Sequence, residues 1–362
     1  MTGQKPYLIV DSHLDLGFNA IQVNRDLTMP SRTVRTHDME GVREQFGSCT
    51  VSFPDLRHGN VGIIFGTVMS RLDPRDRLSG TGMYDQSQCY GVGSGHYAFY
   101  RAMEKEGILR FITSTDEMNA IVQTWSNPAP DSPIGLVLAM ESADPILDVD
   151  QLPLWYDRGL RIVSLSHYGV SSYCHGTGTE GGLLPRGRDL LTALREAGII
   201  VDLTHTTDQA FWEIIEAYDG PVGATHHNCR SLTPGQRQLT DEMIQAIIER
   251  GGVIGTAFDA WMLDPNWNPD LPAYQQTTDA TLATVVDHIE HVCQLAGNAR
   301  HASIGTDLDG GYGQEQSPRD LDTIADLQKL VPEMKRRGFV ESEIQGILSG
   351  NWIRLLKETW GP

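Results

Sequence analysis

The chain has 362 residues and a strongly acidic composition, with 28 Lys and Arg against 47 Asp and Glu and a formal net charge of -19. Hydrophobic residues make up 40% and charged residues 21%, and the mean hydropathy is -0.28, which is typical of a soluble globular protein with a sizeable core. Because phosphate binding requires clustered cations, this charge balance argues against nucleic acid and against an anionic membrane as partners.

The amino-terminal segment and the cysteines bear on location. The apolar run near the start covers only residues 7–10, whereas a signal peptide needs about 7–15 apolar residues and a membrane span about 20. The five cysteines are scattered, odd in number and without a C-x-x-C pair, so neither a disulfide framework nor a thiolate zinc site is expected. We therefore expect a cytoplasmic protein without a membrane anchor.

Short apolar, β-rich runs alternate with helical patterns along the chain. Most of these runs are almost continuously apolar, as expected for strands that are buried on both faces of a parallel sheet. Polar residues follow each run and mark its end. The eight predicted strands are residues 7–10, 61–69, 134–140, 161–166, 199–204, 221–225, 252–258 and 302–306.

Amphipathic helical segments separate the later strands. In residues 240–251 the apolar positions recur with helical spacing, Thr240 suits the N-cap, and Gly251 suits the position after the last turn. Longer helices are predicted in residues 278–297 and 318–337. Each helix is long enough to cover one crossover between parallel strands.

Strand–helix alternation repeated eight times predicts an α/β fold of the (β/α)8 TIM-barrel type, as a single domain over residues 1–362. A doubly wound open sheet is the alternative, but no glycine-rich phosphate loop follows an early strand. The long connections at residues 24–60, 70–95 and 259–276 are predicted to be loops over one face of the barrel.

Residues that can bind metal or transfer protons follow six of the eight predicted strands. Barrel enzymes carry their chemistry at the carboxyl ends of their strands, so these side chains are predicted to face one shared site. A histidine or carboxylate after a single strand is usually a surface or turn residue, but six such strand ends are not expected by coincidence. The seven candidates are His13, Asp15, Glu141, His167, His205, His226 and Asp307.

This set of side chains predicts a catalytic metal site. Imidazole and carboxylate ligands without thiolates are typical of catalytic rather than structural zinc. One catalytic zinc needs about three protein ligands, and more are present, so two metal ions are predicted. Glu141 is the candidate for a bridging carboxylate, with a shared water between the metals activated as hydroxide.

Other polar residues near these strand ends are given different roles. His227 competes with His226 as a ligand, because only one of two adjacent strand residues points inward, and His226 is preferred. Asp11 is predicted to lie one layer deeper than the ligands and to support one of them. His288 and His291 lie three residues apart on a predicted helix, where we expect a solvated face.

The segments that carry these residues resemble the membrane (renal) dipeptidase family, peptidase family M19 of the amidohydrolase superfamily, and in particular its soluble bacterial members. Motifs as short as H-x-D are weak alone, but the ordered set is specific. The sequence differs from the usual family motifs at Leu14, Ser142, Ala143 and Gln238. These differences do not change the predicted metal ligands, but they leave the identity of the substrate open. The matching segments are VDSHLDL, LAMESADPI, SLSH, VDLTHTT, THHNCRSLTPGQRQLTDEMIQAI and IGTDLDG.

The resemblance implies a barrel of the metal-dependent hydrolase type that holds two Zn²⁺ ions. It places His13 and Asp15 on the first zinc and His205 and His226 on the second. Glu141 would bridge the two ions and so take part in catalysis. Nitrogen and oxygen ligands also accept other divalent metals.

The resemblance also implies roles in substrate binding and proton transfer. His167 would contact the scissile carbonyl and the oxyanion, and Arg237 would bind the free carboxylate of the substrate. Asp307 would contact the substrate and exchange protons with the water and the leaving amine. Arg230 competes with Arg237 for the carboxylate, and Asp309 competes with Asp307 for proton transfer.

The activity implied by the resemblance is the hydrolysis of dipeptides, including those with a D-residue at the carboxyl end. An amidohydrolase that acts on N-acyl amino acids, lactones or other carboxylate-bearing amides is the alternative, because the same metals and arginine would serve it. A catalytically inactive barrel that only binds a ligand is a third hypothesis. Family habit implies a homodimer, for which the sequence has no feature of its own.

Overall fold

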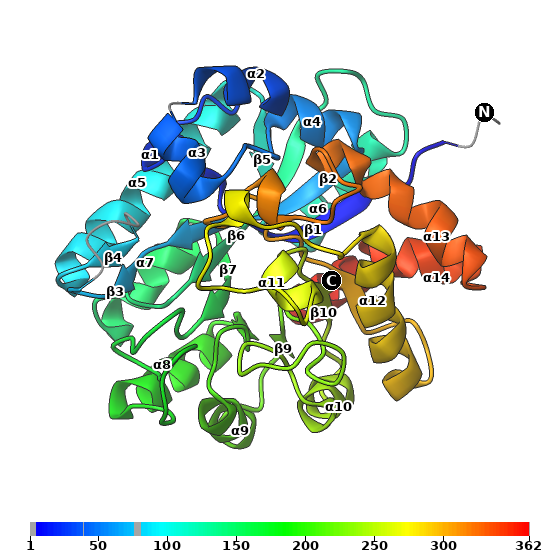
Figure 1. The fold of residues 1–362 in the computed structure, drawn as a ribbon. Helices are drawn as coiled ribbons and strands as arrows, with labels where there is room; N and C mark the ends of the chain where they lie inside the picture. Colours follow the sequence, from blue (N-terminus) through cyan, green and yellow to red (C-terminus); the bar gives the residue numbers. More distant parts are fainter. Residues whose placement is uncertain (1–4, 39, 76–80, 362) are drawn as a thin grey trace.

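Parallel strands curl into a barrel that is surrounded by helices (Figure 1). The computed structural model describes residues 5–38, 40–75 and 81–361. All eight predicted strands are present, with the first one starting two residues later and running to residue 14. These strands are β1 (Ile9–Leu14), β2 (Val61–Met69), β6 (Ile134–Glu141), β7 (Leu160–Ser164), β8 (Ile200–Asp202), β9 (Val222–Gly223), β10 (Ile254–Thr256) and β11 (Ala302–Ile304).

The strands neighbour one another in chain order. The main sheet runs β1-β2-β6-β7-β8-β9, a parallel bridge at Ala224 leads to β10, and β10 pairs with β11. β11 meets β1 through side chains: Ser12 Oγ donates to the carbonyl of Ile304 at 2.9 Å, and the N–H of Thr306 donates to Asp11 Oδ1 at 2.8 Å. The sheet thus returns to its first strand, as a (β/α)8 barrel requires.

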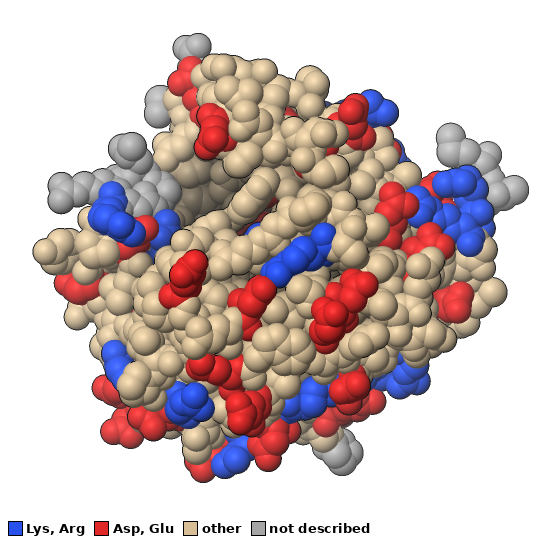
Figure 2. All heavy atoms as spheres, turned by 60° about the horizontal axis from the view of Figure 1, so that its bottom comes forward, with Lys and Arg blue, Asp and Glu red and all other residues tan. Residues whose placement is uncertain are grey.

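The strand interiors are buried on both faces. Every residue of β2 and of β6 is buried, which confirms the reading of continuous apolar runs as strands covered on both sides. Phe65 of β2 and Trp352, both fully buried, meet edge to face with ring centroids 4.9 Å apart. The outer surface is mixed in charge, and Figure 2 shows acidic side chains interspersed with lysine and arginine on one face.

The covering helices follow the strands. In α10, Thr240 accepts the N–H of Met243 and Gly251 follows the helix at a φ of +71°, so both predicted ends of this helix are confirmed. The covering helices are α5 (Gln86–Lys105), α6 (Thr115–Trp125), α7 (Leu152–Asp157), α8 (Pro185–Glu196), α9 (Asp208–Ala217), α10 (Asp241–Glu249), α12 (Leu282–Ala296), α14 (Glu341–Gln345) and α15 (Asn351–Trp360), with the short η1 (Val149–Gln151) and the π-helical turn η5 (Gly346–Gly350).

The long connections contain more structure than the sequence predicted. Residues 86–95, predicted as loop, form the start of α5, because Asp85 and Gln88 make a capping box that begins the helix there. Residues 76–80 of the same connection lie outside the described residues. The elements in and beside the connections are α1 (Leu16–Ile21), α2 (Ser31–His37), α3 (Glu40–Phe46), α4 (Phe53–His58), β3 (Arg71–Leu72), β4 (Gly82–Met83), α11 (Ala260–Leu263), η2 (Ala273–Gln275) and η3 (Gln314–Gln316).

Two local predictions need correction. Residues 318–337 form the 3₁₀ helix η4 (Ile324–Lys329) and the short helix α13 (Leu330–Arg336) rather than one long helix. Pro332 explains the break, because it lacks the N–H that would continue an α-helical pattern from η4. The short strand β5 (Leu109–Phe111), which pairs with the start of β6, was not predicted.

Candidate metal centre and active site

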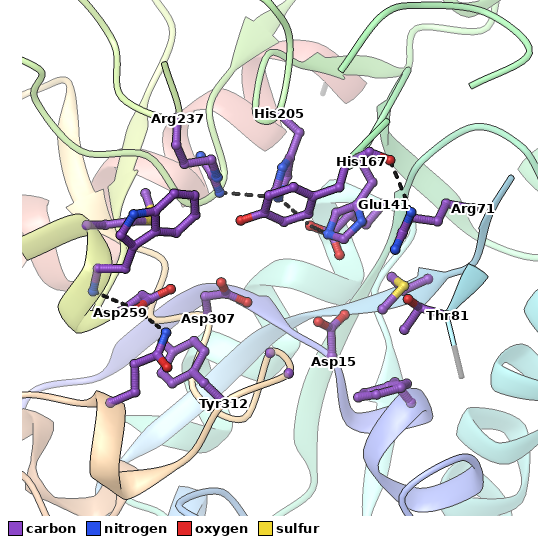
Figure 3. Close-up of a pocket in the computed structure, with 18 residues that line it drawn as sticks. Asp15, Arg71, Thr81, Glu141, His167, His205, Arg237, Asp259, Asp307 and Tyr312 are labelled. Carbon is purple, nitrogen blue, oxygen red and sulfur yellow. Dashed lines mark hydrogen bonds and ion pairs between the residues drawn. The ribbon is translucent and has the colours of Figure 1, made fainter. Parts of the chain in front are cut away.

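The predicted site residues lie at the rim of the barrel where six strands end. Most of their side chains face one cavity of about 280 Å³ (Figure 3). His13 and His226 do not line it but are buried next to Glu141. A cavity of this size suits a small ligand. It is lined by Asp15, Phe18, Met69, Arg71, Thr81, Glu141, His167, Tyr168, His205, Arg237, Asp259, Trp261, Met262, Asp307, Gly310, Gly311, Tyr312 and Gln316.

Glu141, the last residue of β6, is at the centre of the cluster. Its Oε1 lies 3.2 Å from His205 Nε2, 3.3 Å from His226 Nε2 and 3.5 Å from His13 Nε2. The Nε2 atoms of His205 and His226 are 3.2 Å apart, and His13 Nε2 is 3.8 Å from Asp15 Oδ1. Three of the five predicted metal ligands thus surround Glu141, and the fifth, Asp15, joins the cluster through His13.

The ligand-capable atoms form three overlapping groups. In each group every ligand atom lies within 4.8 Å of the others, and Glu141 belongs to two of the three. A shared carboxylate between neighbouring groups is the arrangement that a pair of metal ions requires. The groups are His13, Glu141 and His226; Glu141, His167 and His205; and His13, Asp15 and Asp307.

Thr225 determines which nitrogen of two histidines faces the cluster. Its hydroxyl donates to Asp202 Oδ2 at 2.6 Å. Thr225 Oγ1 can therefore only accept from the Nδ1–H groups of His226 at 3.0 Å and His13 at 3.3 Å. In their neutral forms both rings then carry their proton on Nδ1 and keep the Nε2 lone pair for a ligand.

Thr177 orients His205 in the same way. Its hydroxyl lies within donor reach of the His205 carbonyl at 3.3 Å, and its oxygen is 3.0 Å from His205 Nδ1. The Nε2 of His205 is left as an acceptor and lies 3.2 Å from Arg237 Nη2 as well as 3.2 Å from His226 Nε2. The lone pairs of His205 Nε2 and His226 Nε2 thus lie close to each other and to the carboxylate of Glu141. There are too few hydrogen atoms among these three groups to form a hydrogen bond in each pair.

These separations fit a divalent metal. Ligands held about 2.0–2.1 Å from a tetrahedral zinc lie about 3.3–3.4 Å from one another. The three separations among His205 Nε2, His226 Nε2 and Glu141 Oε1 are 3.2, 3.2 and 3.3 Å. His13 Nε2 is buried and has no hydrogen-bond partner among the described residues. The residues present therefore fit a metal-binding role.

Burial sets the charge of these groups. It holds the pKa of His205 and of His226 well below the usual range and raises the pKa of Glu141. At His13 burial also acts to lower the pKa, but the carboxylates of Glu141 and Asp15 outweigh it and raise that pKa. The low pKa values hold His205 and His226 as neutral imidazoles, the state in which histidine binds a metal. His13 has to release a proton to bind one, because the two carboxylates favour its charged form.

The backbone is strained where two of the strands end. His205 has a φ of +65° and Asp307 a φ of +58°, in the left-handed region that costs a non-glycine residue about 1–3 kcal/mol. A Cβ at Gly310 would lie 1.9 Å from Asp307 Oδ1, so the turn after β11 requires glycine there. Strained backbone of this kind persists when surrounding contacts hold it, and it turns both side chains toward the cavity.

Of the two arginine candidates, only Arg237 lines the cavity. It is 4% exposed, its Nη2 donates to the carbonyl of His226 at 3.1 Å, and its Nη1 has no hydrogen-bond partner among the described residues. Arg230 instead forms two bonds of 2.7 Å with the carboxylate of Asp208. The guanidinium that can receive an anion is that of Arg237.

The two aspartate candidates after β11 differ in the same way. Asp307 lines the cavity, 3.8 Å from His13 Nε2, and burial raises its pKa well above the usual range. Asp309 accepts the N–H groups of Thr50 and Val51. Asp309 therefore anchors the connection between α3 and α4, and of the two aspartates only Asp307 faces the cavity.

The remaining predicted site residues lie as follows. His167, after β7, lines the cavity with its Nε2 3.7 Å from Glu141 Oε1, and burial holds its pKa well below the usual range. Asp11 accepts the N–H groups of His13 and Thr306, in keeping with a supporting role. His227 belongs to none of the groups of potential ligands among the described residues.

Some features of the site were missed from sequence. Thr225 and Asp202, which orient the ligands, stand just before His226 and in the segment VDLTHTT, and that closeness is the signal that could have found them. Asp259 lines the cavity but was left in a predicted loop. His288 is buried rather than solvated, because its Nδ1 accepts the N–H of Cys229 at 3.0 Å.

The sequence model of the membrane dipeptidase family, peptidase family M19, matches residues 4–360. The chain belongs to this family. The resemblance noted from the motifs is thereby confirmed, and the chain stands among metallopeptidases that hydrolyse peptide bonds. Its (β/α)8 barrel matches solved structures of metallopeptidases over almost the whole chain.

Individual relatives are more distant. A Klebsiella pneumoniae protein described as lying in the pqqA 5′ region is 31% identical over 193 residues, which is 53% of this chain and 67% of that protein. Dipeptidase aclJ of Aspergillus oryzae is 29% identical over 57% of this chain. The matched region is about half (46%) of the length of dipeptidase aclJ. A metallopeptidase from Rhodobacter sphaeroides, solved with a phosphinate mimic of L-Ala-D-Ala, has a TM-score of 0.79 at 21% identity, with 98% of this chain and all of that chain (100%) covered.

None of the helices in the described part of the chain is long and apolar enough to cross a membrane.

Proposed function

We propose that the protein is a binuclear zinc dipeptidase that hydrolyses dipeptides with a free carboxylate, including those with a C-terminal D-residue. The observation that carries this proposal is the convergence of three Nε2 atoms on Glu141 Oε1 at 3.2–3.5 Å. Beside them lies Arg237, whose Nη1 has no hydrogen-bond partner among the described residues. The cavity thus places a group suited to an anion directly beside a cluster suited to metal, since Arg237 Nη2 lies 3.2 Å from His205 Nε2. A dipeptide offers a polarisable carbonyl and a carboxylate at a matching short distance.

The two metal sites share Glu141. His13 and Asp15 would complete the first and His205 and His226 the second. Bound zinc ions polarise a carbonyl and lower the pKa of a water molecule, so that a nucleophile is supplied near neutral pH. The strained backbone at His205 and the hydroxyl of Thr225 hold the imidazoles ready, so little reorganisation is needed on binding.

Arg237 would bind the carboxylate of the substrate. Its Nη2 is committed to the carbonyl of His226, and its Nη1 remains for a charge-assisted hydrogen bond inside a buried cavity. Such a bond holds the substrate in one register and so fixes the scissile amide next to Glu141. Orientation of this kind contributes to rate as well as to affinity.

His167 and Asp307 would act on the amide. A neutral His167, protonated on one nitrogen, can donate a hydrogen bond to the carbonyl oxygen as negative charge develops there. Asp307 can take a proton from the attacking water and give it to the leaving nitrogen, and its raised pKa favours this exchange near neutral pH. Both side chains line the same cavity as Arg237.

The test is hydrolysis by the zinc-loaded protein of L-Ala-L-Ala and L-Ala-D-Ala, compared with L-Ala-L-alaninamide and N-acetyl-L-alanine. We expect both dipeptides to be cleaved, with the amide at least about 100-fold slower in kcat/KM because it lacks the carboxylate that Arg237 would bind. Metal analysis should find about two zinc ions per chain.

Three results would contradict the proposal. Full activity after thorough removal of metal would exclude a metal-dependent reaction. Faster cleavage of N-acetyl-L-alanine than of either dipeptide would favour an N-acyl amino acid amidohydrolase. Absence of both bound metal and hydrolysis would indicate a barrel that only binds a ligand.

A further inference from the structure

One carboxylate in the wall of the cavity has no part in the proposed metal centre. Asp259 stands between β10 and α11 and lines the same cavity as Arg237. It is only 7% exposed. In Figure 3 Asp259 and Arg237 lie on one side of the cavity and Arg71 on the opposite side, with Asp307 and Asp15 between them.

The two carboxylate oxygens of Asp259 differ in their hydrogen bonds. Oδ1 accepts the N–H of Trp261 at 2.8 Å and Gln316 Nε2 at 2.8 Å. Oδ2 accepts no hydrogen bond from the residues that the structure describes, and no lysine, arginine or histidine among them forms an ion pair with it. Burial raises the pKa of Asp259 to about 6, so the carboxyl is mostly ionised at neutral pH in surroundings that disfavour its charge.

Asp264, at the other end of α11, shows what a purely structural carboxylate looks like in this segment. Its Oδ1 accepts the N–H of Asn266, and its Oδ2 accepts the Thr278 hydroxyl and the N–H of Asp279, at 2.8–2.9 Å. Both oxygens of Asp264 are thus satisfied within the protein. Asp259 keeps one oxygen on the cavity side without a partner, which is costly for a buried charge unless a ligand supplies a cation.

On Arg71's side of the cavity the charge is already balanced. Arg71 Nη1 forms an ion pair of 2.8 Å with Asp73 and a bond of 3.4 Å to the carbonyl of Tyr168. The charge of Arg237 lowers the pKa of Asp259 at a distance, but the two side chains form no ion pair among the described residues. The cavity therefore offers a cation-binding and an anion-binding group on the same side, separated from each other.

We propose that Asp259 selects dipeptides whose C-terminal residue has a basic side chain, lysine or arginine. The inference rests on the proposed function, in which Arg237 binds the carboxylate of that residue. The side chain of the same residue then lies on the side of the cavity that Asp259 shares with Arg237 (Figure 3).

The neighbouring side chains suit a long cationic chain. Trp261 and Tyr168 line the cavity and stack on each other, with ring centroids 6.3 Å apart and an interplanar angle of 23°. Met262 adds a further apolar contact. Aromatic faces and methionine pack against the methylene stem of lysine or arginine, and a carboxylate beyond them pairs with the charged end.

A structural role for Asp259 makes a different prediction. Its Oδ1 caps the short helix α11 and holds Gln316, so loss of these bonds would weaken the cavity wall for every substrate. Asp259→Asn separates the two roles, because the amide oxygen can still accept the N–H of Trp261 while the negative charge is removed. The difference between the roles then appears only when the charge of the substrate is varied.

The experiment compares Ala-Lys with Ala-norleucine and Ala-Glu, each with an L- or a D-residue at the carboxyl end. Norleucine keeps the aliphatic chain of lysine and lacks its ammonium group. We expect the wild type to prefer Ala-Lys over Ala-norleucine by about 10-fold or more in kcat/KM, and Ala-Glu to be the poorest substrate. In Asp259→Asn the preference for lysine should fall to about 2-fold or less, mainly through KM, with Ala-norleucine cleaved as by the wild type.

Asp270→Asn is the matched control, because Asp270 is exposed in the same connection and its loss changes the net charge equally. It should keep the preference for lysine, which excludes a general attraction of cations to the acidic protein. A wild type that does not prefer lysine over norleucine overturns the proposal, as does an equal loss on all substrates in Asp259→Asn. Failure to cleave any dipeptide would instead count against the proposed function.

Discussion

Two sets of buried histidines in this barrel look alike by burial and differ in what their nitrogens meet. His205 and His226 lie at the rim, and His96 and His288 lie where helices pack on the barrel. Burial lowers the pKa of all four, to about 4 for His96 and for His288. Neither burial nor the direction of the pKa shift tells the two sets apart.

The hydrogen-bond partners do tell them apart. His288 Nδ1 accepts the N–H of Cys229 at 3.0 Å, and His96 Nδ1 accepts the N–H of Met69 at 3.2 Å. At the rim, the hydroxyl oxygen of Thr225 accepts a hydrogen bond from Nδ1–H of His226. The Nε2 of His226 then carries a lone pair, and it faces the Nε2 of His205. A buried histidine therefore indicates a metal site when its free lone pair meets other lone pairs.

The largest effect is expected from breaking the rim cluster itself. Glu141→Gln and His205→Ala should each lower kcat/KM for dipeptides by about 10³-fold or more, because both metal sites or one of them would lose a ligand. Zinc content per chain should fall in parallel. A helix-packed histidine gives the control: His288→Asn keeps an acceptor for Cys229 and should keep full activity at pH 7.

The next effect concerns the anion-binding end of the cavity. Arg237→Ala should lower kcat/KM for L-Ala-L-Ala by about 100-fold or more, chiefly through KM, because the buried carboxylate of the substrate would lose its charged partner. Arg230→Ala, which breaks the pair with Asp208 outside the cavity, should leave KM within about 2-fold of the wild type. The opposite ranking of the two variants would assign the carboxylate to Arg230.

A smaller effect is expected from the hydroxyl that orients the ligands. Thr225→Val removes the acceptor for His226 and His13 at almost constant volume, and it should weaken zinc binding by about 10–100-fold. Competition with a chromogenic chelator measures the dissociation constant. Thr124→Val is the control, since this hydroxyl bonds only to the carbonyl of Ala120 on an exposed face of α6. Unchanged zinc affinity in Thr225→Val would contradict the proposal that Thr225 orients His226 and His13 for metal binding.

The smallest effect on activity, and a distinct effect on stability, is expected from the helix-packed set. The pKa of His288 is about 4 in the fold against an ordinary value of 6.5, so its contribution to stability is complete above pH 6.5 and is lost as the pH falls toward 4. At pH 5 the loss amounts to about 2 kcal/mol. The free energy of unfolding, measured by urea denaturation, should therefore fall less between pH 7 and pH 5 in His288→Asn than in the wild type. Equal losses in both proteins would contradict the assignment.

Much of the fold could be read from the sequence because the barrel strands are apolar on both faces. Residues 61–69 were predicted to the residue as β2, and Thr240 and Gly251 marked the ends of α10. The prediction was wrong where local signals were overlooked or overridden. The capping box at Asp85 starts a helix in a predicted loop, and Pro332 divides a predicted helix.

The site divides along a similar line. The sequence by itself determined which ligand types stand at the strand ends, since a parallel barrel brings all its carboxyl ends to one rim. Only the tertiary structure shows that Arg237 and Asp307 line the cavity, whereas Arg230 pairs with Asp208 and Asp309 accepts backbone N–H groups. The two arginines, and likewise the two aspartates, have the same chemistry and nearly the same position in the chain.

The tertiary structure also gave roles to residues that look ordinary in the sequence. Thr225 orients two imidazoles and Asp259 faces the cavity beside Arg237, although threonine and aspartate are common at strand ends and turns. The physical reason is that a hydrogen bond or an uncompensated charge depends on distances of a few ångströms between segments far apart in the chain. Residue type and spacing determine which groups reach the rim, and packing determines which of them meet.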